Sequence, residues 1–210
     1  MELITSSFEP DGAIPARYAF AKPDPDEHVT LADNVNPALA WSDVPEEGTK
    51  SFALICHDRD VPSVGDDVNK EDREVPPDLP RVDFFHWVVV DLLADVRSIS
   101  EGEFSDGVVA GGRQAAEGPY GSRQGLNDFT GWFAGDPDMA GNYYGYDGPA
   151  PPWNDSVIHH YLFTVYALDV EETPVAGDFT GHEVRQAIEG HVLAEDTVIG
   201  TYTQNPRLLS

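Results

Sequence analysis

Apolar runs along this chain alternate with turns rich in Gly, Pro and acidic residues, a pattern typical of short strands joined by tight connections. Two runs, FFHWVVVDLL at 84–93 and YLFTVYALDV at 161–170, are nearly continuous and rich in β-branched and aromatic residues. We expect both to be central strands. Shorter strands are expected in ELITSSF at 2–8, LAW at 39–41, SFALICHD at 51–58 and TVIGTYT at 197–203.

Helical periodicity is convincing in one segment, TGHEVRQAIEGHVLAED at 180–196. Its residues Val184, Ile188 and Val192 recur every four positions, and Thr180 is a candidate N-cap with Glu183 as its capping-box partner. Several strands, one helix and many turn signals indicate a mainly β architecture. The sequence contains no internal repeat.

Two segments lack periodicity and are predicted to be loops. The stretch 63–80 contains three prolines and is expected to be a solvated excursion. The stretch 100–148 is dense in Gly and aromatic residues, which favours a set of packed loops around a site.

The composition supports a folded protein of one domain. Of the 210 residues, 40% are hydrophobic and 10% aromatic, which is enough for a substantial core. All-β domains commonly reach this length as one unit, so residues 1–210 are interpreted as a single domain with an excursion at about 63–80.

The charge is strongly acidic and spread along the chain. Twelve Lys and Arg against 38 Asp and Glu give a formal net charge of −26, which disfavours nucleic acid and anionic lipid as partners. This pattern resembles the proteins of salt-loving organisms with molar KCl in the cytoplasm, where the Debye length shrinks to about 3 Å. An ordinary acidic cytosolic protein is the alternative.

Compartment signals are few. Cys56 is the single cysteine, so an intrachain disulfide is impossible. The start of the chain lacks the basic and apolar regions of a signal peptide, and no apolar run is long enough to span a membrane. We therefore expect a cytoplasmic protein.

Polar residues at strand ends are the candidates for chemistry. His86 lies inside an apolar run, so it is either a hydrogen-bonded core histidine or a group facing a cavity. Asp58 and Asp60 end a strand, where they either cap a turn or orient an imidazole.

A third candidate is the stretch YDGPAPPWNDSVIHHY at 146–161. Its prolines fix the backbone, and Gly148 allows close approach to a ligand. His159 and Tyr161 lie two apart in a strand and share one face. Either this is a rigid solvent turn before a strand, or it forms the rim of a small polar pocket.

Four motifs in order, DRDVP, FHWVVVDL, GYDGPAPPW and HHYLFTVYALD, resemble those of the phosphatidylethanolamine-binding protein family. This family includes Raf kinase inhibitor protein, and the similarity is greatest to its bacterial and archaeal Raf-kinase-inhibitor-like branch. The resemblance extends from about Ser51 to Asp169, with AIEGHVLAED matching the closing helix of the branch. It implies a β-sandwich of antiparallel Greek-key sheets with a C-terminal helix, and an anion pocket for phosphate head groups without a catalytic mechanism.

The resemblance also implies the ligand-binding residues of that pocket, which are Asp58, Asp60, His86, Gly148, Pro151, His159 and Tyr161. Three positions depart from the family pattern. Arg59 replaces a proline, Ala150 stands where prokaryotic members often have cysteine, and His160 replaces an arginine. The loss of that arginine leaves less fixed positive charge for a phosphate.

We hypothesise that His86 and His159 bind the anion, with Asp58 orienting His86. A bound anion raises the pKa of an imidazole above about 6.5, so affinity would weaken as pH rises past that region.

The function expected from the sequence is a non-enzymatic binding or regulatory protein, with inhibition of a kinase or protease suggested by relatives. Its partners would be a small anionic ligand and an unknown protein, homodimerisation is plausible, and no cofactor is expected. The alternative is a metal-dependent hydrolase in which four residues ligate zinc or iron, namely His57, Asp58, His86 and His159.

Two other motifs are weaker. Cys56 beside His57 resembles a thiol nucleophile but is better interpreted as a buried strand residue. The stretch 136–147 imitates a calcium loop, yet Ala140 and Asp147 fail two of its positions, so it is interpreted as an ordinary loop.

Overall fold

The computed structural model describes residues 1–209. Its strands are β1 (Glu2–Ile4), β2 (Ala21–Asp24), β3 (His28–Leu31), β4 (Leu39–Ser42), β5 (Ser51–Pro62), β6 (Arg81–Leu93), β7 (Ser98–Ile99), β8 (Arg123–Gln124), β9 (His159–Leu168) and β10 (Val192–Tyr202). The helices are α1 (Phe129–Trp132) and α2 (Gly181–Ala187), with 3-10 turns at Ala16–Tyr18, Pro119–Gly121 and Pro206–Leu208.

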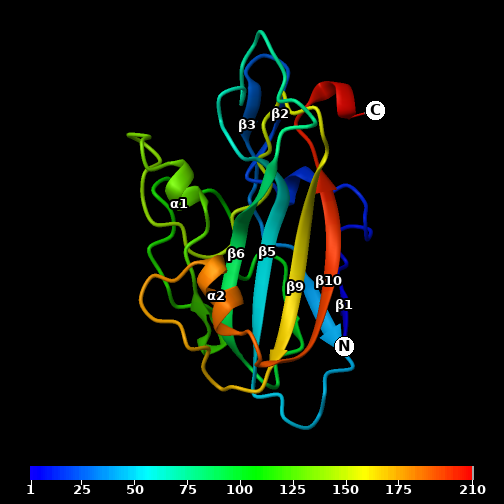
Figure 1. Ribbon diagram of the computed structural model, residues 1–210, viewed down its shortest axis with the longest axis vertical. Coiled ribbons are helices and arrows are strands. Elements are labelled where there is room, and N and C mark those ends of the chain that lie inside the picture. The colour runs from blue at the N-terminus through cyan, green and yellow to red at the C-terminus, as the bar shows by residue number, and fades with distance from the viewer. Residues whose placement is uncertain (210) are drawn as a thin grey trace.

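Two antiparallel sheets form the body of the molecule. The larger has the order β10-β9-β5-β6-β8, and the smaller has the order β1-β4-β7. Between them lies an apolar core that takes Leu39 and Trp41 from the small sheet and Phe52, Trp87 and Phe163 from the large one. The mainly β prediction is confirmed, and β6 and β9 are interior strands on either side of β5 (Figure 1).

On the opposite face of the large sheet, α2 packs over β6 (Figure 1). Val184 and Ile188 pack there against Ile55, Phe85 and Val88. Because both faces are buried in the middle of β5 and β6, the stretches 52–56 and 87–90 are continuously apolar rather than alternating in polarity.

The predicted helix at 180–196 is too long. Its capping box between Thr180 and Glu183 is present, but the helix ends at Ala187, and Gly190 takes a left-handed φ of 82°. Val192 then opens β10, which pairs with β9, so its fourfold spacing from Ile188 was coincidental. Sheet pairing outweighs a short helical pattern because it satisfies a whole row of backbone groups.

The β2–β3 hairpin and loop 63–80 lie together beyond one end of the long strands (Figure 1). The hairpin was missed in the sequence. The loop contains no helix or strand, as predicted, but it is not merely solvated. Val75 is fully buried, and the Asn154 side chain binds the loop through carbonyl oxygens of Asp67, Lys70 and Arg73.

In the chain as described up to Leu209, no helix combines the length and apolar character needed to cross a bilayer.

Candidate functional site

A cavity of about 310 Å³ opens at the end of the large sheet where the hairpin and loop 63–80 meet. Strands β5, β6 and β9 supply its floor, and the hairpin, loop 63–80, α1 and the Pro-rich loop (residues 146–158) supply its walls. The lining residues include Phe20, Leu31, Asp58, Val64, Val68, Phe84, His86, Phe129, Trp132, Phe133, Ala150, Pro151, Pro152, Tyr161 and Gln204.

The walls are mainly aromatic. Phe20 stacks on Phe129 at a centroid distance of 4.5 Å, Phe84 meets Phe129 edge-on at 5.2 Å, and Phe133 stacks on Phe129 at 5.6 Å. Trp132 lies at the mouth with 55% of its surface exposed. These rings restrict solvent at the floor, which strengthens polar interactions there.

The polar floor consists of Asp58, His86 and Tyr161, one from each of three adjacent strands. In the sheet register Asp58 of β5 is opposite Tyr161 of β9 and Phe84 of β6. The imidazole of His86 meets the Tyr161 ring edge-on at 5.2 Å. All three floor residues are at most 3% exposed.

Asp147 fixes the tautomer of His86. The Nδ1 atom of His86 lies 2.8 Å from the Asp147 carbonyl oxygen, and the Asp147 N–H donates to the His86 carbonyl at 3.0 Å. A carbonyl only accepts, so Nδ1 carries the hydrogen and Nε2 is left with a lone pair. Burial lowers the pKa of His86, which keeps the ring neutral.

Asp147 is itself held by a buried network. Its carboxylate accepts from Asn34 at 2.7 Å, from Asn127 at 2.8 Å and from Arg113 at 3.2 Å. Burial raises the pKa of Asp147 despite these three donors. The network fixes the backbone that orients His86, so Asp147 positions the ring without touching the cavity.

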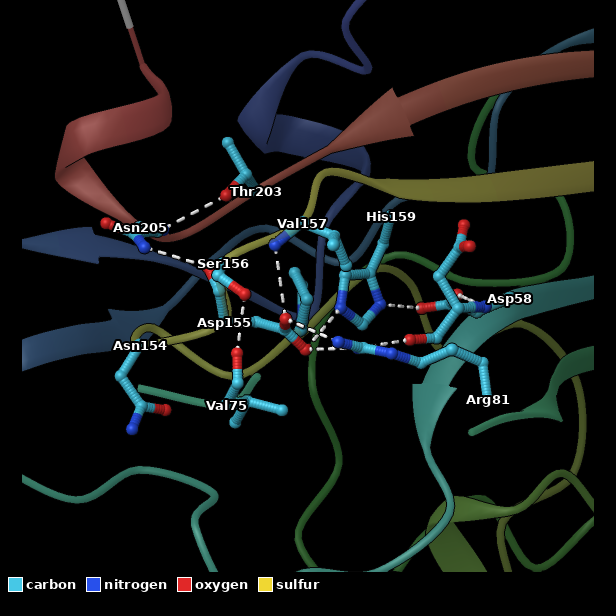
Figure 2. Close-up of polar contacts among 12 residues, drawn as sticks. Asp58, Val75, Arg81, Asn154, Asp155, Ser156, Val157, His159, Thr203 and Asn205 are labelled. Atoms are coloured by element: carbon cyan, nitrogen blue, oxygen red, sulfur yellow. Dashed lines mark hydrogen bonds and ion pairs between the residues drawn. The ribbon is translucent and has the colours of Figure 1, made fainter. Parts of the chain in front are cut away.

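His159 lies behind the floor, between two carboxylates (Figure 2). Its Nδ1 is 2.7 Å from Asp58 Oδ2 and its Nε2 is 3.0 Å from Asp155 Oδ2. Arg81 binds Asp155 from the far side with two nitrogens, at 2.6 and 3.1 Å. The result is a buried row of alternating charges, Asp58, His159, Asp155 and Arg81.

The charges in this row stabilise one another. Burial alone would lower the pKa of His159, but Asp58 and Asp155 raise it to about 9. Burial alone would raise the pKa of Asp58 and of Asp155. It is outweighed at Asp58 by His159 together with His86 and the Asp60 N–H, and at Asp155 by His159 together with Arg81, so both pKa values lie below the ordinary range. Asp58 is therefore held ionised with His159 as an imidazolium.

The Tyr161 hydroxyl is buried and, within residues 1–209, makes no hydrogen bond of normal geometry, although the Asp58 carboxylate lies close enough to act on it. Burial first, and then the nearby Asp58 carboxylate, raise the pKa of Tyr161 well above its usual value. A buried hydroxyl without a partner costs free energy, roughly 1–3 kcal/mol. An unpaired group of this kind at the floor of a cavity indicates a ligand site.

The sequence-predicted residues divide into two groups. Asp58, His86, Pro151 and Tyr161 line the cavity. Asp60, Gly148 and His159 lie behind this lining.

The residues behind the lining support it. The Asp60 N–H donates to Asp58 Oδ1 at 2.8 Å, while its own carboxylate binds the backbone and ring of His160. Gly148 is buried and donates its N–H to Asn34. His160 thus pairs with Asp60 rather than facing the cavity, whereas Ala150 lines it.

One expectation about orientation is wrong. Asp58 was expected to orient His86, but it binds His159, and the Asp147 carbonyl orients His86. Asp58 and His159 are on neighbouring strands with their polar atoms at hydrogen-bond distance, while the bulge in β5 next to Asp58 shifts its register against β6. The sequence motif alone contained no signal for this choice.

The four residues of the alternative metal site do not converge. His57 points to the opposite face of the sheet, where its ring lies 5.9 Å from that of Phe85 and near Asp83. Burial, and then Arg185, lower the pKa of His57 to about 4. Across the described part of the chain, no group of three or more His, Cys, Asp or Glu is placed to hold a metal ion.

The two weaker motifs are accounted for by structure. Cys56 is buried in the core between the sheets, as predicted for a strand residue. Asp136 accepts from the backbone of Asp138 and Met139 in an exposed turn, whereas Asp147 belongs to the buried network. The calcium-like stretch is therefore an ordinary loop, as the sequence indicated.

Several important residues were missed from the sequence. Phe84 lies two residues before His86, so strand alternation was a usable signal for it. Asp147 and Asp155 lie within the quoted stretch 146–161, but aspartates in a turn-rich segment have many possible roles. Arg81 begins β6 directly after loop 63–80 and Arg113 lies in the loops of 100–148, and neither offered a signal in the sequence.

Gly148→Ala should destabilise the protein by about 1–3 kcal/mol, because inserting a methyl group into a filled site is costly. A Cβ built at Gly148 lies 2.0 Å from the Tyr18 carbonyl oxygen. Urea unfolding checks this, with Gly131→Ala as the matched control because no atom lies within 4 Å of a Cβ there. Equal midpoints for both variants would contradict the tight packing at Gly148.

The fold and the cavity define the class of protein. The sequence model of the family described as phosphatidylethanolamine-binding protein matches residues 4–203. The chain therefore belongs to the phosphatidylethanolamine-binding protein family, as the motifs predicted.

Individual relatives agree with this assignment. UPF0098 protein YbhB of Escherichia coli (strain K12) is 32% identical over 97% of this chain and 100% of its own length. A UPF0098 protein of Methanothermobacter thermautotrophicus is 33% identical over 96% of this chain and 98% of its own. The crystal structure of Escherichia coli YbcL superimposes with a TM-score of 0.68 at 26% identity, covering 96% of this chain and 97% of that one.

Proposed function

We propose that this protein is a non-catalytic binding and regulatory protein whose cavity holds a small ligand by a phosphate-bearing head group. The observation that carries the proposal is the unpaired Tyr161 hydroxyl, which lies with Asp58 and His86 at the floor of an aromatic-walled cavity. A head group that receives the Tyr161 hydrogen bond would relieve its desolvation cost. The aromatic walls suit the rest of the ligand.

Binding accounts for the floor better than catalysis does. Nucleophilic catalysis needs a nucleophile beside a base that can accept its proton. Both nitrogens of His159 are occupied, which leaves His86 Nε2 as the free imidazole nitrogen at the floor, and the raised pKa of Tyr161 disfavours its phenolate as the nucleophile there. The metal-dependent hydrolase lacks an assembled ligand set, as described above.

The family membership extends the proposal to regulation. The occupied cavity would control contact with a protein partner, and a kinase or a protease is the kind of enzyme that such a protein would inhibit. The acidic surface sets the solution conditions, because self-repulsion at a net charge of −26 is relieved by molar KCl.

Calorimetric titration with O-phosphorylethanolamine in molar KCl tests the proposal. We expect saturable binding that Tyr161→Phe weakens by about tenfold, because one hydrogen bond to a charged head group is lost. The same variant should be at least as stable as the parent, since it removes a buried unpaired hydroxyl. Tyr166→Phe, on β9 and outside the cavity lining, is the matched control. Binding that is equal in all three proteins would contradict the proposal.

A further inference from the structure

The cavity suits a ligand that donates hydrogen bonds, because its floor presents mainly acceptors. Among the residues that the structure describes, no Lys or Arg lines it. The positive charge of His159 is shielded from the ligand by Asp58 and is already shared with Asp155. An anionic head group thus meets no free cation at the floor.

Two of the three floor groups are acceptors. The neutral His86 ring presents the lone pair of Nε2, because its Nδ1 hydrogen goes to Asp147. Asp58 is an ionised carboxylate with about four acceptor sites, of which the His159 ring and the Asp60 N–H use one each. Tyr161 is the remaining group and supplies one donor.

A fully ionised anion is disfavoured by this arrangement. Its oxygens are acceptors, and an oxygen placed against the Asp58 carboxylate would be repelled with no shared hydrogen between them. A phosphomonoester that retains one hydrogen on oxygen avoids the repulsion, because its P–OH group donates to the carboxylate. A sulfate ester has the same single charge but no such hydrogen at neutral pH.

We propose that the cavity selects the singly protonated phosphate head group, with its P–OH donating to Asp58 and another oxygen accepting from Tyr161, and that it rejects sulfate esters. This inference rests on the proposed function, since it specifies which form of the head group binds at the same floor. It makes Asp58 a specificity-determining residue.

The titratable groups around the head group come from every neighbouring element. Asp58 and Asp60 are on β5, His86 on β6, and His159 and Tyr161 on β9. Asp147 and Asp155 approach from the Pro-rich loop, with Arg113 and Arg81 paired to them. His57 lies on the other face of β5. The groups of the buried row, Asp58, His159, Asp155 and Arg81, keep their charges when the ligand binds. A proton taken up on binding therefore belongs to the ligand or to His86.

The proton balance gives a direct signature. A phosphomonoester loses its second proton near pH 6. Above that pH the free ligand is mainly the dianion, and one proton must be taken from buffer for each ligand bound. Affinity should then fall about tenfold per pH unit between pH 7 and 8, while the row around Asp58 keeps its charges.

The decisive comparison uses two ligands with the same body, O-phosphorylethanolamine and ethanolamine O-sulfate. We expect the sulfate ester to bind at least about tenfold more weakly at pH 6, because one charge-assisted hydrogen bond is replaced by repulsion. Calorimetry at pH 8 in buffers of different ionisation enthalpy should report about one proton taken up per phosphate ester bound.

The variant Asp58→Asn tests whether Asp58 causes the preference for the phosphate ester over the sulfate ester. The amide can donate, so the preference for the phosphate ester should shrink to within about threefold, whereas Asp83→Asn on the opposite face should keep it. If Asp58→Asn fails to fold, the affinities of the parent protein for the two esters and its proton uptake at pH 8 still test the inference.

The outcomes separate this inference from the proposed function. Equal affinity for the two esters would overturn the inference and leave a binding site in which a protonated His86 holds any anion. Binding of neither ester would overturn both. Preference for the phosphate ester with no proton uptake at pH 8 would also overturn it, since the dianion would then be the bound form.

Discussion

Asp155→Ala is expected to lower the free energy of unfolding by about 3–5 kcal/mol, the range for removing one partner of a buried ion pair. Asp155 is 1% exposed and binds both the His159 ring and the Arg81 guanidinium. Without its carboxylate, two buried cationic groups lose their shared counter-ion. Urea unfolding in constant molar KCl measures the effect.

An exposed pair of the same chemistry provides the control. Asp169 binds the His191 ring at 2.8 Å with both side chains about two-fifths exposed, so Asp169→Ala should cost no more than about 1 kcal/mol. Adding Arg81→Met to Asp155→Ala should recover part of the loss, because it removes the unpaired cation. A loss of similar size at Asp155 and Asp169 would show that the buried row contributes little.

Stability is expected to be greatest near pH 6.5 and to fall on the alkaline side by about 3 kcal/mol as pH rises through about 9. His159 causes this fall, since its pKa is raised from 6.5 to about 9 in the folded protein. A raised pKa means that the folded state binds the proton more tightly than the unfolded chain. The contribution is complete below pH 6.5 and is lost progressively up to about pH 9, at about 1.4 kcal/mol per pH unit.

Below pH 6.5 the stability of the folded protein decreases for a different reason. Burial lowers the pKa of His86 and, with Arg185, lowers that of His57 to about 4. The unfolded chain therefore takes up these protons first as pH drops below 6.5, which favours unfolding. Asp58 and Asp155 add to the loss in stronger acid because their pKa values lie below the ordinary range.

Urea midpoints between pH 5 and 9.5 would trace this profile. His159→Gln is the informative variant, because it removes the group that titrates on the alkaline side. It should be less stable at pH 6.5 yet nearly flat between pH 7 and 9. A parent protein whose stability is unchanged across that interval would contradict a protonated His159.

The network that sets stability also sets the chemistry of the cavity. His159 keeps Asp58 ionised. Asp147 accepts the Nδ1 hydrogen of His86, so the Nε2 atom of that ring keeps its lone pair. Neither supporting residue lines the cavity. Substitutions behind the floor should therefore change ligand selectivity as well as stability.

The sequence by itself determined the strands of the core and the family. Apolar runs at 51–58, 84–93 and 161–170 identify strands because burial on both faces requires nearly continuous apolar residues. The four ordered motifs then pointed to Asp58, His86 and Tyr161, which do form the floor of one cavity. His159 and Tyr161, which strand alternation predicts to share a face, are both fully buried in β9.

Only the tertiary structure decided how the polar groups pair. Asp58 and His159 are about a hundred residues apart in sequence and meet because β5 and β9 are neighbours in the sheet. The roles of Asp147 and Asp155 depend on Arg113 and Arg81, which reach them from distant segments. The sequence pattern specifies which residues are buried, because burial follows from apolar periodicity. It does not specify hydrogen-bond partners, because these depend on register, bulges and loop paths that place a donor within about 3 Å of an acceptor.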